Sequence, residues 1–320
     1  MMIDVVALGE LLIDFTENGV SGQGNPLFEA NPGGAPCNVL AMLRKLDKSC
    51  AFIGKVGDDM FGRMLEQTAK NAGISTEHLL KDDHIPTTLA FVKTLEGGDR
   101  DFSFYRKPGA DINLTEEELP LDVLENARIF HFGSVSQTDE PVRSATKKAV
   151  QIAKKAGSLI SYDPNLRPPL WKDLALAKEE IAWGLGQCDI LKIADNELLF
   201  MTGEEDFDKG AEILQKQYPN IKLLNVTAGA GGSYAYNEDK RVFAPAFCLG
   251  GTIETTGAGD TFCACVLSYV LERGLNGLTE ENLTEMLRFA NAAAYLVTTK
   301  KGAILSMPER NDVEKILFPG

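Results

Sequence analysis

The feature that most constrains the fold is an alternation of short apolar runs and helical patterns after about residue 111. We expect the apolar runs to be strands, at 129–132, 159–162, 190–193 and 223–227. Apolar residues recur at helical spacing between them, at 141–155, 174–185, 196–201 and 208–217. Strands that alternate with helices indicate a parallel sheet covered on both faces. The pattern therefore predicts an α/β fold.

The chain before residue 111 breaks this alternation with a polar loop and a hairpin. The elements expected there are strands at 3–8 and 10–15, a loop at 18–34, a helix at 35–46, a strand at 51–56, a helix that starts at Asp58 or Asp59 and runs to 72, and strands at 87–94 and 101–106 joined by a turn at 96–99. We expect the loop and the hairpin to form a small sheet apart from the main one. The elements expected after residue 230 are a hairpin of 234–237 with 241–244 and helices at 261–273 and 280–299.

The acidic balance of the chain excludes two classes of partner. Its 320 residues include 46 Asp and Glu against 32 Lys and Arg, a formal net charge of −14. Such a surface repels nucleic acid and anionic membranes, so we expect neither as a partner. The first residues lack the pattern of a signal peptide, and no apolar run approaches the ~20 residues of a membrane helix. Six cysteines without a CxxC pair indicate reduced thiols, no metal site among them and a cytoplasmic protein.

The segment Thr255-Thr256-Gly257-Ala258-Gly259-Asp260-Thr261 carries the strongest chemical signal. Two glycines and an alanine expose the backbone directly before a predicted helix. Unpaired amides and the positive end of the helix dipole together form an anion cradle. Asp260 is an unusual neighbour for an anion, and two interpretations stay open. It caps the helix, or it takes a proton from a hydroxyl that attacks a phosphate.

Polar groups also follow several predicted strands, where open α/β sheets bind their ligands. Asp14 either binds ligand hydroxyls or faces solvent. The pair Gly33-Gly34 and the amide of Asn38 suit a polyol, although a plain loop-to-helix turn also explains the glycines. The run Asp163-Pro164-Asn165-Leu166-Arg167 brings three polar side chains to one strand end, which favours a functional role. The glycines of 226–232 either admit a nucleotide or form a tight turn.

Absent motifs narrow the chemistry. The chain has no G-x-x-x-x-G-K-[ST] and no complete G-x-G-x-x-G after the first strand, which disfavours P-loop NTPases and dehydrogenases. His78, His84 and His131 lie in no motif with a nucleophile, so we expect them to be structural and the base to be a carboxylate. Hydroxyl-binding groups, an anion cradle and a carboxylate base together predict phosphoryl transfer to a sugar alcohol.

These clusters, in this order, resemble the ribokinase/PfkB-type carbohydrate kinases from end to end. The early match is Pro32-Gly33-Gly34-Ala35-Pro36-Cys37-Asn38, and the late match runs from Thr255 to Phe262. The stretches 9–15, 104–111 and 163–171 are most similar to those of fructokinases. The resemblance implies a ribokinase-like three-layer α/β/α fold with a mostly parallel central sheet. It also implies a core of 1–12, 37–86 and 111–320 that carries a β-sheet lid of 13–36 and 87–110.

The resemblance implies ATP-dependent phosphorylation of D-fructose to fructose 6-phosphate, with a role for each matching position. Asp260 would be the base on the sugar hydroxyl, and the amides of Gly257, Ala258 and Gly259 would form the anion hole. The sugar would be bound by Asp14, Gly33, Gly34, Asn38, Arg106 from the lid, and Arg167. The nucleotide would lie against Lys192, Thr227, Gly229, Gly232 and Asn291.

Two departures from the family concern metal ions. Mg²⁺ is expected, with Glu197 as a ligand through water, but Ala194 stands where the family's Asn-x-x-Glu element has its Asn. A K⁺ ion is expected beside the anion hole, at Glu254, Thr256, Val297, Lys300, Gly302 and Ser306. The family usually has Asp where this chain has Glu254, and a longer side chain shifts or weakens that site.

The family's lid often forms a dimer interface, so the resemblance also implies a homodimer. Two alternatives to a fructokinase stay open. One is a kinase for another sugar, 2-keto-3-deoxygluconate or ribose. The other is a non-catalytic sugar-binding relative, which the intact Asp260 and glycines disfavour.

Overall fold

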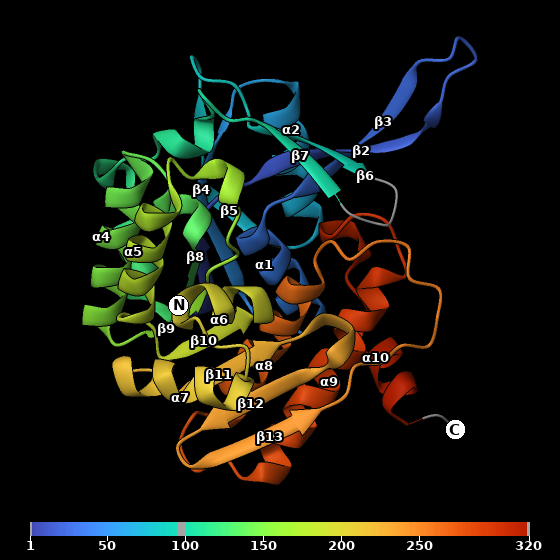
Figure 1. Ribbon diagram of the computed structural model, residues 1–320. Helices are drawn as coiled ribbons and strands as arrows, with labels where there is room; N and C mark the ends of the chain where they lie inside the picture. Colours follow the sequence, from blue (N-terminus) through green and yellow to red (C-terminus); the bar gives the residue numbers. More distant parts are fainter. Residues whose placement is uncertain (1, 95–99, 319–320) are drawn as a thin grey trace.

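The computed structural model describes residues 2–94 and 100–318, and in this part of the chain it contains a large and a small sheet (Figure 1). The large sheet has nine strands in the order β13-β12-β11-β10-β9-β8-β1-β4-β5, and the small sheet has four in the order β3-β2-β6-β7. The strands of the large sheet are β1 (Ile3–Leu8), β4 (Cys50–Gly57), β5 (Ser75–Asp82), β8 (Ala127–Gly133), β9 (Leu159–Asp163), β10 (Ile190–Ala194), β11 (Leu223–Thr227), β12 (Ser233–Asn237) and β13 (Lys240–Ala244). Those of the small sheet are β2 (Leu12–Val20), β3 (Pro26–Gly33), β6 (Leu89–Thr94) and β7 (Arg100–Tyr105).

The large sheet is mostly parallel, as predicted. The strands from β11 to β5 in the sheet order run parallel to their neighbours, and only the late hairpin of β12 and β13 is antiparallel. The carboxyl ends of the parallel strands therefore meet at one edge. This edge is where α/β sheets of this kind place their ligands.

Helices cover both faces of the large sheet, as the alternation predicts. The α-helices are α1 (Ala35–Lys45), α2 (Met60–Asn71), α3 (Leu121–Glu125), α4 (Val142–Ala156), α5 (Leu174–Leu185), α6 (Asp195–Thr202), α7 (Phe207–Gln217), α8 (Ala258–Arg273), α9 (Glu280–Thr298) and α10 (Arg310–Leu317). Short 3₁₀ turns lie at Ala110–Asn113, Glu116–Glu118, Ser134–Gln137, Pro168–Leu170, Gly229–Gly231 and Ile304–Ser306.

The side chains of each strand alternate between two hydrophobic cores, as the pleat requires. Val5 packs with α1, α2, α8, α9 and α10, whereas its neighbour Val6 packs on the opposite face with α3, α4, α5 and α7. Figure 1 shows α4 and α5 on one side of the sheet and α1 and α8 on the other. The fold is the three-layer arrangement that the resemblance implies.

One predicted segment is wrong, and one strand and two α-helices lacked a prediction. The segment 18–34 is not a loop, because β2 continues to Val20 and β3 pairs with it antiparallel. Its prolines and glycines are compatible with a strand because β3 is an edge strand, where missing ladder bonds are tolerated. The predicted hairpin of β6 and β7 is confirmed, although its turn at 96–99 lies outside the described residues. Strand β5 and helix α10 lacked a prediction because their apolar patterns are weak, and helix α3 lacked one because it has only five residues.

The small sheet projects from the carboxyl edge of the large sheet (Figure 1). One face of this sheet is aromatic: Phe15 stacks on Phe91 with ring centroids 4.9 Å apart and meets Phe61 of α2 edge-on at 5.6 Å. The chain crosses between the sheets four times, because β2, β3, β6 and β7 each begin or end near this edge. In the described residues, no helix has both the length and the apolar character that crossing a membrane requires.

Candidate active site

Two adjoining cavities open at the carboxyl edge, and the start of α8 lies between them. The first, of about 270 Å³, is shared by the small sheet, the start of α1 and the loop after β9. The second, of about 460 Å³, lies against β11, α8 and α9. Thr255 and Gly259 line both. The predicted anion cradle therefore stands at the junction of two compartments.

The backbone at the start of α8 depends on its two glycines. Gly257 precedes the helix with φ 79°, in the left-handed region, and no side chain caps the first turn. A Cβ at Gly257 would lie 2.8 Å from the Cβ of Ala303, and one at Gly259 would lie 3.0 Å from Nζ of Lys192. Glycine at both positions thus allows the helix N-terminus to approach its neighbours with its amides uncapped.

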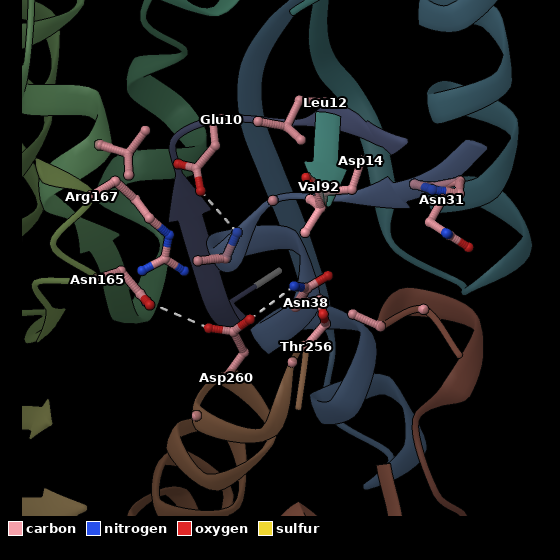
Figure 2. A pocket seen from close by; sticks show the side chains of 18 of the residues that line it. Glu10, Leu12, Asp14, Asn31, Asn38, Val92, Asn165, Arg167, Thr256 and Asp260 are labelled. Carbon is pink, nitrogen blue, oxygen red and sulfur yellow. Dashed lines mark hydrogen bonds between the residues drawn. The ribbon is translucent and has the colours of Figure 1, made fainter. Parts of the chain in front are cut away.

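Asp260 lies in the first turn of α8 and is 7% exposed. Its Oδ2 accepts a hydrogen bond from Nδ2 of Asn38 at 2.8 Å, and its Oδ1 accepts one from Nδ2 of Asn165 at 3.4 Å (Figure 2). Burial raises the pKa of Asp260, and the Asn38 bond and the charges of Lys192 and Arg167 act in the opposite direction. The carboxylate does not cap its own helix, so the capping interpretation is not supported.

A buried ion pair lies beneath this helix start. Nζ of Lys192, on β10, lies 3.1 Å from Oδ2 of Asp163, at the end of β9, and both side chains are almost fully buried. Burial opposes the charge of Lys192, but the carboxylates of Asp163, Glu197 and Asp260 outweigh it and raise the lysine pKa. Lys192 lines neither cavity. It places positive charge behind Gly259 rather than in the open nucleotide compartment.

Most of the predicted sugar residues line the first cavity. Asp14 from β2, Gly34 and Asn38 from the start of α1, and Arg167 from the loop after β9 all contribute to its wall (Figure 2). Gly33 does not line it; a Cβ there would lie 2.5 Å from Oδ2 of Asp14, so this glycine makes room for the carboxylate.

Arg106 is the exception among the predicted sugar residues. It follows β7 and is 4% exposed, and it does not line the first cavity. Its guanidinium donates to Asp111 at 2.8 Å, to Oγ1 of Thr138 at 2.7 Å and to the Val135 carbonyl at 3.0 Å. These hydrogen bonds hold the Arg106 side chain in the interior, where the small sheet joins the rest of the protein. The expectation that Arg106 reaches the sugar is therefore not met in this structure.

Asn165 and Glu10 are two of the cavity residues that the sequence analysis did not assign. Asn165 belongs to the singled-out run after β9, but only its neighbour Arg167 was assigned; its amide approaches Asp260 because its backbone adopts φ 48°. Glu10 lines the cavity while 6% exposed, and its Oε1 accepts the Ala35 amide at 2.8 Å. Burial raises the pKa of Glu10 to about 7. Its position directly after an apolar strand was the available signal.

The predicted nucleotide residues other than Lys192 line the second cavity. Thr227 ends β11, Gly229 and Gly232 form the following turn, and Asn291 projects from α9. Asn291 also braces the wall, since its Nδ2 donates to the Ala244 and Pro245 carbonyls and its Oδ1 accepts from Ser233. The rest of the wall is largely apolar, with Ala258 of the predicted anion hole and residues that the sequence analysis did not assign: Ala246, Phe247, Phe262, Ala294 and Tyr295.

The predicted metal ligands occupy two places. Each oxygen of Glu197 accepts one backbone amide, from Leu166 at 2.7 Å and from Ala194 at 2.9 Å, which leaves each oxygen a further lone pair. Oε1 of Glu254 accepts the Gly302 amide at 3.0 Å. In the described residues there is no cluster of three or more His, Cys, Asp or Glu suited to a metal ion.

The other predicted potassium ligands surround Glu254. Thr256 and Gly302 line the first cavity with it. Oγ of Ser306 donates to the Lys301 carbonyl, and the Lys300 amide donates to the Val297 carbonyl at 3.3 Å. The segment after α9 lies against the start of α8, since a Cβ at Gly257 would lie 2.8 Å from the Cβ of Ala303.

His131, expected to be structural, lies in the interior of the large sheet. It is buried on β8, and its Nδ1 lies 2.9 Å from Oγ of Ser161 on the neighbouring strand. Burial lowers the pKa of His131 to about 3, with the charge of Lys192 acting in the same direction. Because His131 is buried and lines neither cavity, it is not placed to act as the base of either one.

A sugar-sized polar cavity, an uncapped helix start with a buried carboxylate and an apolar second cavity define a carbohydrate kinase site. The family model described as pfkB family carbohydrate kinase matches residues 2–310. The chain therefore belongs to the pfkB family of carbohydrate kinases, and the predicted family is confirmed.

Relatives within the family are similar over nearly their whole length. The chain is 42% identical to probable fructokinase-4 of Arabidopsis thaliana, over 98% of this chain and 96% of that protein. It is 44% identical to fructokinase-2 of Oryza sativa subsp. japonica, over 95% of this chain and 90% of that one.

Solved structures agree in fold. Fructokinase from Xylella fastidiosa with bound ATP has a TM-score of 0.89 at 28% identity, covering 99% of this chain and 98% of that chain. A double-mutant fructokinase from Vibrio cholerae O395, in a fructose, ADP and potassium ion bound form, also has a TM-score of 0.89 at 28% identity and covers 99% of each chain.

Proposed function

We propose that this chain catalyses the ATP-dependent phosphorylation of D-fructose to fructose 6-phosphate. The observation that carries the proposal is the buried carboxylate of Asp260 at an uncapped helix start, where a polar and an apolar cavity meet. The polar cavity takes the sugar and the apolar cavity takes the adenine nucleotide. The fructokinase relatives, similar along almost the entire chain, support this assignment.

In the proposed reaction, Asp260 takes the proton of the sugar's 6-hydroxyl as its oxygen attacks the γ-phosphorus of ATP. The bond from that phosphorus to the bridging oxygen breaks, and ADP leaves. Asn38 and Asn165 each bond one oxygen of Asp260, which aims the carboxylate into the first cavity. The amides of Gly257, Ala258 and Gly259 stabilise the charge on the transferring group. The transition state is loose, so positioning supplies most of the catalysis.

The remaining site residues hold the substrates in this scheme. Asp14 and the Gly34 backbone bind sugar hydroxyls, and Arg167 binds the sugar or the phosphate. Lys192 strengthens the anion hole from behind Gly259. Thr227, Gly229, Gly232 and Asn291 border the nucleotide. Arg106 positions Val135, whose side chain lines the cavity, instead of contacting the sugar.

Magnesium and potassium fit the donor groups present. Mg²⁺ is held mainly by phosphate oxygens and water in sites of this kind, and the remaining lone pairs of Glu197 can accept such water. When bound, the ion neutralises charge on the phosphates of ATP. Glu254, the backbone near Thr256, Val297, Lys300 and Gly302, and the Ser306 side chain supply the oxygen donors proposed for K⁺. We expect K⁺ bound at this site to activate the enzyme.

The small sheet, residues 13–36 and 87–110, acts as a lid in this proposal, on a core of 1–12, 37–86 and 111–320. Its residues Asp14, Val92 and Phe104 line the sugar cavity, so closure over a bound sugar excludes water. The opposite face of the small sheet exposes Val20, Phe28 and Tyr105. We assign this face to a homodimer interface, and we place the enzyme in the cytoplasm.

The experiment that tests the function measures kcat/KM over fructose, 2-keto-3-deoxygluconate and ribose, with and without K⁺, by coupled ADP release. The expected result is a clear preference for fructose and stimulation by K⁺. A clear preference for another sugar would replace the substrate assignment and leave the kinase assignment standing. Tight fructose binding without ADP release would favour a non-catalytic sugar-binding protein.

A further inference from the structure

Glu10 stands where the chain leaves the large sheet for the small one. Strand β1 ends at Leu8 and β2 begins at Leu12. The chain returns from the small sheet through Gly34 into α1, and Oε1 of Glu10 accepts the first amide of that helix, from Ala35, at 2.8 Å (Figure 2). One buried carboxylate therefore joins the outgoing and the returning crossings on the wall of the sugar cavity.

A continuous series of contacts leads from Glu10 to Asp260, the proposed base. A Cβ at Gly34 would lie 2.3 Å from the Glu10 carbonyl oxygen, so the two backbones touch. The Gly34 carbonyl accepts the Asn38 amide at 2.9 Å, and Nδ2 of Asn38 donates to Asp260 at 2.8 Å. A movement of Ala35 away from Glu10 would displace both the Gly34 peptide and the Asn38 side chain.

Charged and titratable groups from two elements face this carboxylate. The side chains of Arg106 and Asp111 lie beyond the end of β7, and Cys37 faces it from α1. Burial raises the pKa of Glu10 to about 7, whereas the backbone amides of Glu10 and Ala35 and the charge of Arg106 oppose that rise. Burial, helped by the Glu10 charge, raises the pKa of the Cys37 thiol to about 12, so the thiol stays neutral. Glu10 is the member of this group that changes charge near neutrality.

We propose that Glu10 is a positioning residue for the sugar, whose ionised carboxylate holds the start of α1 so that the Gly34 peptide and Asn38 lie in place for sugar binding. The inference rests on the proposed function, because it takes the first cavity to be the fructose site. A charged acceptor bonds a helix N-terminal amide more strongly than a neutral one. Protonation of Glu10 therefore raises the KM for fructose and leaves the KM for ATP unchanged.

The test compares the wild-type enzyme with Glu10→Gln from about pH 6 to about pH 8.5, a range that spans the titration of Glu10. Glutamine keeps the length and the acceptor oxygen but removes the charge. We expect the wild-type KM for fructose to rise about fivefold towards the acidic end of this range. A change of this size corresponds to weakening one hydrogen bond, the one from the Ala35 amide to Glu10. Glu10→Gln should show the higher KM throughout, without pH dependence. The matched control is Glu17→Gln, at an exposed acid of β2, which should keep the wild-type profile.

The outcomes separate the inference from the function on which it rests. A wild-type KM profile in Glu10→Gln would overturn the role of Glu10. A wild-type enzyme that does not phosphorylate fructose would instead overturn the proposed function, whatever the variant does. If Glu10→Gln fails to fold, Glu10→Asp decides: it keeps the charge but shortens the reach to Ala35, so it should raise the KM for fructose. An unchanged KM in Glu10→Asp would also contradict the proposal.

Discussion

The environment of Asp260 sets burial, which favours the neutral acid, against groups that favour the carboxylate. Two amide groups, from Asn38 and Asn165, bond its oxygens, and Lys192 and Arg167 contribute positive charge. Burial alone would favour the neutral acid. The balance leaves a carboxylate with a raised pKa, which makes it a better proton acceptor than an exposed aspartate.

Replacing the Asp260 carboxylate by an amide should lower the catalytic rate without lowering the stability of the fold. Asp260→Asn keeps the shape and a hydrogen-bond acceptor for Asn38, so the melting temperature should not fall. Its kcat should drop by about 10²–10⁴, the usual contribution of a positioned general base. Steady-state kinetics with fructose and a thermal melt measure the two effects. A variant that folds and retains near-wild-type kcat would remove Asp260 from the role of base.

The ionised form of Glu10, which the proposal needs for sugar binding, lowers the free energy of unfolding. Its pKa in the folded protein, about 7, lies above the ordinary value of 4.5, so the folded state binds the proton more tightly. The stability contributed by the protonated group is complete below about pH 4.5 and is lost as the pH rises to about 7. Relative to Glu10→Gln, the wild-type free energy of unfolding should therefore fall by roughly 3 kcal/mol across that range. Denaturant titrations of both proteins at about pH 4.5 and about pH 7 measure this change in the free energy of unfolding. The same pH dependence in the wild type and in Glu10→Gln would contradict the raised pKa of Glu10.

At the scale of elements, the start of α8 carries most of the chemistry. No side chain caps this helix end, and although the Ala258 amide donates to the Thr255 carbonyl at 3.3 Å, the first turn leaves amides for a ligand. The segment after α9 packs closely against Gly257 through Ala303. The cradle is thus held in place by a segment distant in sequence, and its geometry depends on the glycine.

Gly257→Ala tests this dependence. Alanine must adopt φ 79° and place its Cβ 2.8 Å from that of Ala303, so we expect a loss of about 1–3 kcal/mol in stability. The displaced amides should also lower kcat by about 10²–10³. Gly157→Ala is the control, because Gly157 ends α4 with φ 94° and has nothing within 4 Å of its Cβ position. It should lose stability at normal kcat; equal kcat in both variants would contradict the anion-hole role.

At the scale of the whole molecule, the small sheet has two faces with different environments. One face contributes to the sugar cavity, and the other exposes aromatic and aliphatic side chains that water disfavours. The ring of Phe28 is 41% exposed and meets Phe91 edge-on at 5.5 Å. A second copy of the chain would cover this face and brace the lid.

The homodimer proposal predicts a particle of about twice the 34.8 kDa of one chain in light scattering. Phe28→Glu should convert it to a monomer, because a charge in an apolar interface is not compensated. Phe318→Glu introduces the same charge at an exposed phenylalanine after α10 and should remain dimeric. A wild-type monomer at assay concentration would show that the lid acts without a partner.

Local pattern predicted much of the fold and part of the site. Apolar runs and helical spacing located most of the elements of the large sheet, because neighbouring residues determine them. The segment 18–34 was misassigned because pairing with β2 overrides its loop-like composition. Arg106 was expected to contact the sugar. The direction of its side chain is set by hydrogen bonds to Asp111 and Thr138, which come close to it only in the folded chain.

By itself, the sequence determined the α/β class, the glycine cradle before α8 and the acid within it, since each depends on residues close together in the chain. The tertiary structure alone decided the environment of that acid. It brought Asn38 from α1 and Asn165 from the loop after β9 to Asp260, and it buried Glu10 beside Ala35. The physical reason is that burial and long-range hydrogen bonds set the charge and direction of a polar side chain, and both depend on what the folded chain packs around it.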